Sequence, residues 1–145
     1  MTMTTKQTLG FIERIAFDDL DIHCKAKVDT GACSSSLHAE RIEVFQRDGN
    51  DWVRFHVLFD SNKARIDRLC EAPVLTQRHV TSSNGQTSHR YVIAASVTLA
   101  GQQFTTEVTL SHRGNMTYPV LIGRKALSGR FIVDVSQSFA GDQKG

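Results

Sequence analysis

The chain has few of the residues that mark specialised classes of protein. Its 145 residues include two prolines, one tryptophan and three cysteines, and the cysteines lack the number and spacing of a disulfide framework. A net charge of +2 is too small to indicate nucleic-acid binding. No apolar run has the length of a membrane span, and Met1 to Leu9 lacks the apolar core of a signal peptide. We therefore expect a cytoplasmic protein with reduced thiols and neither a nucleic-acid nor a membrane partner.

The composition that remains is ordinary for a globular protein, with 40% hydrophobic and 22% charged residues. The length suits one domain with a real core, so we expect a single domain over residues 1–145. The ends, 1–5 and 140–145, are expected to be loose tails.

Short apolar stretches separated by turns predict a mostly β protein. Asp48-Gly49-Asn50 and Ala100-Gly101 are expected turns, and a short helical turn is expected after Gly123. The polar, charged segment Ser61 to Cys70 is expected to be a loop or a short helix. The expected strands are Gly10 to Phe17, Ile22 to Val28, Trp52 to Phe59, Leu75 to Ser82, Arg90 to Leu99, Phe104 to Leu110, Pro119 to Ile122 and Phe131 to Val135.

A carboxylate stands where one of these strands ends, in the stretch Val28-Asp29-Thr30-Gly31-Ala32. Strand alternation places Lys27 on the same face as Asp29. The Thr30 hydroxyl and the Gly31 amide can hydrogen-bond the carboxylate and fix its orientation. A single Asp-Thr-Gly is, by itself, most simply a turn aspartate that caps its own backbone.

The segment from Arg78 to Tyr91 is expected to form a hairpin, with Asn84-Gly85 as a two-residue turn. Counting outward from that turn pairs His79 with Arg90 and puts both on one face. Neither face is apolar enough for a core, so the hairpin should project from the domain. The hairpin could cover a binding site, or it could be an ordinary solvated hairpin with no such role.

A second signal follows far along the chain, where the apolar strand from Pro119 to Ile122 runs into Gly123-Arg124. Asp-Thr-Gly-Ala, a projecting hairpin and an apolar-apolar-Gly-Arg turn, in this order, resemble the retropepsin family of aspartic peptidases. There the hairpin forms the flap, and the Gly-Arg turn packs behind the active-site loop. In that family the position four after the catalytic aspartate is often acidic and pairs with the arginine, whereas this chain has Cys33.

A closer resemblance covers nearly the whole chain. It is carried by residues 26–32, by Ser83-Asn84-Gly85 with residues 90–93, and by residues 121–124 with Val133-Asp134. These segments look like a bacterial and archaeal family that is labelled an ATP-dependent zinc protease and is nevertheless retropepsin-like. Its members often accompany the ATP-grasp ligase that adds glutamates to a ribosomal protein.

The resemblance implies an all-β, retropepsin-like closed β-barrel with one short C-terminal helix, and an aspartic peptidase with Asp29, Thr30 and Gly31 as catalytic residues. The chemistry needs two carboxylates and the chain has one Asp-Thr-Gly, because Asp134 is followed by Val-Ser. A homodimer that joins two copies of Asp29 across a two-fold axis is therefore expected.

Cations near these motifs favour an acidic peptide or a polyglutamate-tailed protein as substrate. The alternatives are a non-catalytic module that binds acidic peptides, a zinc-dependent protease, or cations that are simply scattered over the surface. The expected substrate-binding residues are Lys27, Ala32, His79, Ser82, Ser83, Asn84, Arg90, Arg113 and Arg124.

The sequence has no signature for zinc binding and none for ATP binding, the two properties named in the family's label. The chain lacks His-Glu-x-x-His, a Cys-x-x-Cys pair and a Gly-rich phosphate loop. The spacing of the six histidines predicts no ligand set, although His79, His89 and His112 could meet in space. We therefore expect no metal and no cofactor.

Overall fold

The structure is a computed structural model that describes residues 6–61, 64–81, 85–111 and 118–142. These residues form twelve strands and one short helix, α1, at Arg124–Leu127. None of the described helices is long and apolar enough to cross a membrane. The strands are β1 Gln7–Leu9, β2 Ile12–Phe17, β3 Ile22–Val28, β4 Ser35–His38, β5 Glu40–Arg47, β6 Asn50–Ser61, β7 Ala64–Pro73, β8 Thr76–Thr81, β9 Thr87–Leu99, β10 Gln102–Ser111, β11 Val120–Ile122 and β12 Phe131–Val133.

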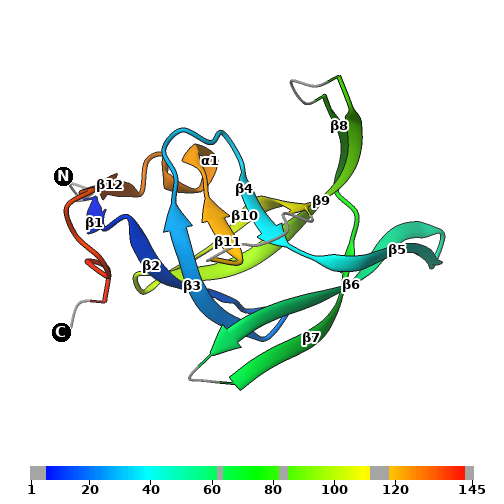
Figure 1. The fold of residues 1–145 in the computed structure, drawn as a ribbon, viewed down its shortest axis with the longest axis horizontal. Coiled ribbons are helices and arrows are strands. Elements are labelled where there is room, and N and C mark those ends of the chain that lie inside the picture. Colours follow the sequence, from blue (N-terminus) through cyan, green and yellow to red (C-terminus); the bar gives the residue numbers. More distant parts are fainter. Residues whose placement is uncertain (1–5, 62–63, 82–84, 112–117, 143–145) are drawn as a thin grey trace, which may run out of the picture.

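Six of the strands close into a barrel (Figure 1). Their order is β10-β4-β11-β3-β2-β9, and β9 returns to pair with β10. The expected all-β barrel with one short C-terminal helix is confirmed. Short β1 and β12 form a separate parallel pair beside the barrel, near the two chain ends.

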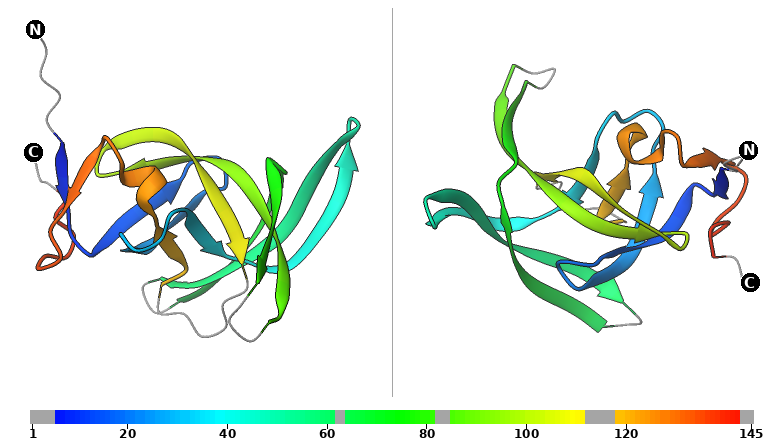
Figure 2. Two further views of the ribbon diagram at one scale, coloured as in Figure 1. Left: turned by 90° about the horizontal axis from the view of Figure 1, so that it is seen from above. Right: turned by 180° about the vertical axis from the view of Figure 1, so that it is seen from behind.

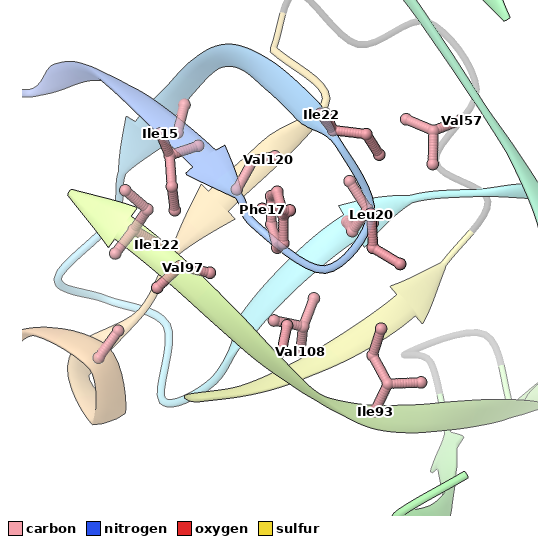
Figure 3. Close-up of a cluster of buried hydrophobic side chains, with 14 of the residues drawn as sticks. Ile15, Phe17, Leu20, Ile22, Val57, Ile93, Val97, Val108, Val120 and Ile122 are labelled. Carbon is pink, nitrogen blue, oxygen red and sulfur yellow. The ribbon is translucent and has the colours of Figure 1, made fainter. Parts of the chain in front are cut away.

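Alternate residues of the barrel strands point inward and form the core (Figure 3). Phe17, Ile22, Val97, Val108 and Ile122 come from five different strands and are each 1% exposed or less. Burying such a side chain contributes about 1.5–3 kcal/mol, so this shared core fixes how the strands are placed relative to one another. The strand ends that carry the polar motifs are thereby fixed as well.

Two expected turns are confirmed as two-residue hairpin loops. Arg47 pairs with Asn50 around Asp48-Gly49, and Leu99 pairs with Gln102 around Ala100-Gly101. All four turn residues have positive φ, as a type I′ turn requires.

The hairpin of β8 and β9 projects from the barrel as expected (Figures 1 and 2), but its register differs from the expected one. Arg78 pairs with Arg90, and His79 pairs with His89. Thr81 pairs with Thr87, which is not the register that a two-residue Asn84-Gly85 turn would give, and Asn84 itself lies outside the described residues. Paired residues share a face, and His79 therefore lies on the face opposite Arg90.

A second sheet of β5, β6 and β7 stands beside the barrel. The expectation of a loop or short helix over Ser61 to Cys70 is wrong for its described part, because residues 64–70 belong to β7 and pair with β6. In β7 only Cys70 and Ala72 are buried. A strand with so few buried side chains has no alternating apolar pattern, and its pairing comes from the neighbouring strand.

The expected loose tail is wrong for residues 140–142. The Glu13 carboxylate, which is 1% exposed, accepts hydrogen bonds from the amide of Gly10 at 2.6 Å and from that of Gly141 at 3.2 and 3.1 Å. Arg14 also forms an ion pair with Asp142. The groups that hold this segment are mostly backbone amides, which no side-chain pattern in the sequence reveals.

Candidate active site

Three strands place Asp29 at one end of the barrel. β11 lies between β3, to which it is parallel, and β4, to which it is antiparallel. β3 has the expected alternation, with Lys25 and Lys27 exposed and Ala26 and Val28 buried. The next amide, of Asp29, donates to the carbonyl of Ile122 at 2.9 Å, so the carboxylate emerges where β3 leaves the sheet.

The loop of residues 29–34 folds back on the Asp29 side chain. The Gly31 amide donates to Asp29 Oδ1 at 2.9 Å, as the sequence predicts. A Cβ on Gly31 would lie 3.2 Å from that same oxygen, so glycine leaves room for the carboxylate. Asp29 is half-buried and Thr30 is exposed. A carboxylate held through one oxygen and reachable from solvent is suited to act as a general base.

The turn from β11 into α1 supports the loop from behind. The amides of Arg124 and Lys125 donate to the carbonyls of Ala32 and Cys33 at 2.8 and 3.0 Å. The Arg124 guanidinium donates to the Thr30 carbonyl at 3.0 Å. Arg124 therefore binds a backbone carbonyl oxygen, whereas the arginine of the retroviral pattern pairs with a carboxylate. This hydrogen bond braces the loop that carries Asp29.

The remaining residues expected to bind substrate are placed unevenly. Lys27 is exposed on β3, Ala32 is half-buried in the loop, and Arg90 is half-buried on β9. His79 lies on the other face of the hairpin, where its ring stacks on that of His89 with centroids 4.7 Å apart. Four residues expected at the site lie outside the described part of the chain: Ser82, Ser83, Asn84 and Arg113.

Sequence reasoning missed a polar cluster beside the loop, made of three charged residues and one serine. Arg78 donates from Nη1 to Ser34 Oγ at 3.1 Å and from Nη2 to Glu107 Oε2 at 2.9 Å. Lys125 Nζ donates to the same Glu107 oxygen at 3.1 Å. Hydrogen bonds from Lys125 and Arg78 hold the pKa of Glu107 below its usual value. The four residues are far apart in the sequence, and only the strand register brings them together.

Asp134 is occupied in a turn of its own. Its carboxylate accepts from the Ser136 amide at 3.0 Å, the Ser136 hydroxyl at 2.6 Å and the Gln137 side chain at 2.7 Å. These hydrogen bonds lower the pKa of Asp134 to about 2. An aspartate so engaged does not supply the second carboxylate that the chemistry needs.

The described residues do not form the zinc site that the label 'ATP-dependent zinc protease' implies. No group of three or more His, Cys, Asp or Glu side chains among them could hold a metal ion. Burial raises the pKa of Cys24 to about 12 and that of Cys70 to about 11, which disfavours the thiolate that zinc requires. His112, one of the histidines weighed as a ligand, lies outside the described residues.

The closed barrel, the Asp-Thr-Gly loop and the Gly-Arg turn that braces it define the retropepsin-like class of aspartic-peptidase folds. The chain belongs to the family described as retropepsin-like aspartic endopeptidase RimB, whose sequence model matches residues 8–144.

The chain is also similar to curated relatives and to a solved structure. The chain is 41% identical over 141 residues to a probable alpha-L-glutamate ligase of Shewanella pealeana, and 40% identical over 134 residues to one of Desulfotalea psychrophila. The matches cover 97% and 89% of this chain but 31% and 28% of those proteins, so the chain spans less than a third of their length. A crystal structure of a Legionella pneumophila protein of unknown function superposes with a TM-score of 0.76 at 26% identity, over 94% of this chain and 99% of that one.

Proposed function

We propose that the chain is an aspartic-type peptidase that hydrolyses acidic peptide tails, polyglutamate among them, by a water held between the Asp29 carboxylates of two copies. The observation that carries the proposal is the Asp29 loop, in which the Gly31 amide orients the carboxylate and α1 fixes the backbone. The match of residues 8–144 to an aspartic endopeptidase family supports the same chemistry.

The reaction follows from two carboxylates that share one proton, as in aspartic proteases generally, because like charges about 3 Å apart cannot both ionise. The ionised Asp29 takes a proton from water, whose oxygen bonds to the carbonyl carbon of the peptide. The protonated Asp29 of the other copy gives its proton to the carbonyl oxygen. When the tetrahedral intermediate collapses, the C–N bond breaks and the first aspartate passes its proton to the leaving amine. The second aspartate takes a proton back from one hydroxyl of the intermediate as the product carbonyl re-forms, so the pair again shares one proton.

Three observations support an acidic substrate. Arg90 is a half-buried cation on the same face of the hairpin as Arg78, whose guanidinium reaches the Asp29 loop. Lys27 is exposed on the strand that leads to Asp29. The relatives named probable alpha-L-glutamate ligases contain a counterpart of this chain within a longer protein. A glutamate chain is therefore the substrate that best matches both the positive charge of this chain near Asp29 and the name of these relatives.

The same relatives favour a second candidate, a module that holds an acidic chain without cutting it. A counterpart within a protein named a ligase would then retain the growing tail. Incubation with a glutamate peptide separates the two candidates: new amino termini support the peptidase, whereas saturable binding with an intact peptide supports the module.

Activity should depend on dimer formation. Because each copy contributes one Asp29, the specific activity should fall as the protein is diluted through its dimer dissociation constant. Sedimentation and rate measurements over the same dilution series test this. A stable monomer with full specific activity would rule out the shared dyad.

Cleavage should be selective for negative charge and sensitive to salt. We expect Arg90→Gln to lower kcat/KM for a glutamate peptide about tenfold, which is about 1.4 kcal/mol and close to the lower end of the range for a hydrogen bond to a charged group. Rising salt should also slow cleavage, because it screens the attraction between the cations and the substrate.

Arg68→Gln is the matched control, since it removes an equal charge from an exposed side chain on β7. A glutamine peptide should be cleaved poorly by the native protein and lose little more with Arg90→Gln. Equal cleavage of both peptides, unaffected by salt, would contradict selection by charge.

A further inference from the structure

The root of the projecting hairpin is tied to the Asp29 loop by one arginine. Arg78 lies on the same face of β8 as Thr76, two residues earlier. Thr76 pairs with Val92 of β9, which is fully buried and shares that face. This face therefore points toward the barrel. From it the Arg78 guanidinium reaches Ser34 Oγ at 3.1 Å, in the last residue of the Asp29 loop.

Glu107 of β10 accepts hydrogen bonds both from this arginine and from Lys125 of α1. Its Oε2 lies 2.9 Å from Arg78 Nη2 and 3.1 Å from Lys125 Nζ. Arg78 and Arg90 are paired directly across the hairpin, where like charges destabilise each other. The negative charge of Glu107 offsets that repulsion at the point where the hairpin leaves the barrel.

The cluster joins the hairpin to the loop by two routes. One is the bond from Arg78 to Ser34. The other runs through Glu107 to Lys125, whose backbone amide holds the Cys33 carbonyl at 3.0 Å. Four separate segments, the Asp29 loop, β8, β10 and α1, are thereby held at one point beside the candidate catalytic carboxylate.

The magnitudes indicate that the cluster acts on geometry more than on stability. The side chains of Arg78, Glu107 and Lys125 are 36, 34 and 47% exposed, and ion pairs of such exposure contribute little to folding. In the described residues β8 pairs only with β9, so the hairpin is held mainly at its root. Thr81 lies three residues beyond Arg78, which is about 10 Å along a strand, and a small tilt at the root therefore moves the far end further.

We propose that Arg78 and Glu107 are positioning residues that set the hairpin against the Asp29 loop, with Glu107 as the acceptor shared by β8 and α1. The catalytic part of this role rests on the proposed function, because a hairpin that covers substrate at Asp29 must be placed correctly for cleavage. A misplacement of about 1 Å near reacting groups can cost about a hundredfold in rate.

Glu107→Gln tests the role, because it keeps the size of the side chain and removes its charge. We expect kcat/KM for a glutamate peptide to fall about tenfold, with most of the loss in kcat because the substrate still binds but is misplaced. The ratio of native to variant kcat/KM should approach one as the pH falls through the lowered pKa of Glu107, since protonation then removes the same charge from the native protein. The charged groups facing Glu107 in this comparison are Arg78 and Lys125.

Glu71→Gln is a matched control. Glu71 is 30% exposed, lies on β7 and accepts hydrogen bonds from Arg47 and Arg54, each at 2.8 Å, which also lower its pKa. It shares the chemistry of Glu107 but belongs to the second sheet. Glu71→Gln should leave kcat/KM and its pH profile unchanged. Equal losses in the two variants would overturn the proposal, because a general loss of stability would then explain both.

Hydrogen exchange supplies a readout that does not need activity. Amides of residues 76–81 and 87–92 should exchange faster in Glu107→Gln and in Arg78→Met than in the native protein or in Glu71→Gln. If the native protein cuts no glutamate peptide, the proposed function fails while this measurement still tests the placement of the hairpin. Unchanged exchange in both variants would overturn the positioning role whether or not the protein is a peptidase.

Discussion

Asp29→Asn should abolish hydrolysis and leave the barrel folded. Asparagine keeps the size of the side chain and an oxygen that can accept the Gly31 amide, so the hydrogen bond to the loop can persist. It cannot take a proton from water, and loss of a general base typically costs about 10²–10⁴-fold, so we expect a fall of at least about a hundredfold. Release of amino termini from a glutamate peptide measures the rate, and thermal unfolding measures the fold.

Asp134→Asn is the matched control, because Asp134 also follows a short strand but is engaged with Ser136 and Gln137. This variant should keep its activity and lose some stability. A chelator should leave the native rate unchanged. Hydrolysis that survives Asp29→Asn, or that EDTA removes and zinc restores, would contradict the aspartic mechanism.

The features that the sequence predicts well are those with local causes. The alternation of β3, the glycine turn after Asp29 and the apolar run into Gly123 each depend on neighbouring residues, and the structure has all three. The turns Asp48-Gly49 and Ala100-Gly101 each have a glycine at the second position, which suits positive φ, and their hairpins form as expected even though Ala100 also has φ 51°. The barrel itself was predicted from the resemblance to retropepsins rather than from periodicity.

The features that the sequence does not predict depend on distant partners. The register of the β8–β9 hairpin is one residue away from the one that an Asn84-Gly85 turn would give, and that slip moves His79 to the other face from Arg90. β7 is a strand because β6 pairs with it, although few of its side chains are buried. The Arg78, Glu107 and Lys125 cluster exists only once β8, β10 and α1 are in place.

Gly123 occupies a position where the close approach of two segments leaves no room for a side chain. Its backbone is extended, with φ −97° and ψ 179°, so any residue could adopt its conformation. A Cβ there would nevertheless lie 2.5 Å from the Ser34 carbonyl oxygen, 2.6 Å from the Ser34 carbonyl carbon and 3.0 Å from the Ala32 carbonyl oxygen. All three are backbone atoms of the Asp29 loop, which cannot rotate away as a flexible side chain would.

Gly123→Ala should therefore push the Asp29 loop away from β11 and lower both activity and stability. We expect a loss of about 1–3 kcal/mol in the free energy of unfolding, as for overpacked sites, and a fall of about a hundredfold in kcat/KM from the displaced carboxylate. Gly101→Ala is the control: it strains a positive φ of 78° at a cost of about 1–2 kcal/mol, but its Cβ meets no atom within 4 Å. Both variants should unfold at lower temperature, while only Gly123→Ala should lose activity when assayed well below its melting temperature. Native kcat/KM in Gly123→Ala would show that the loop does not depend on this close approach.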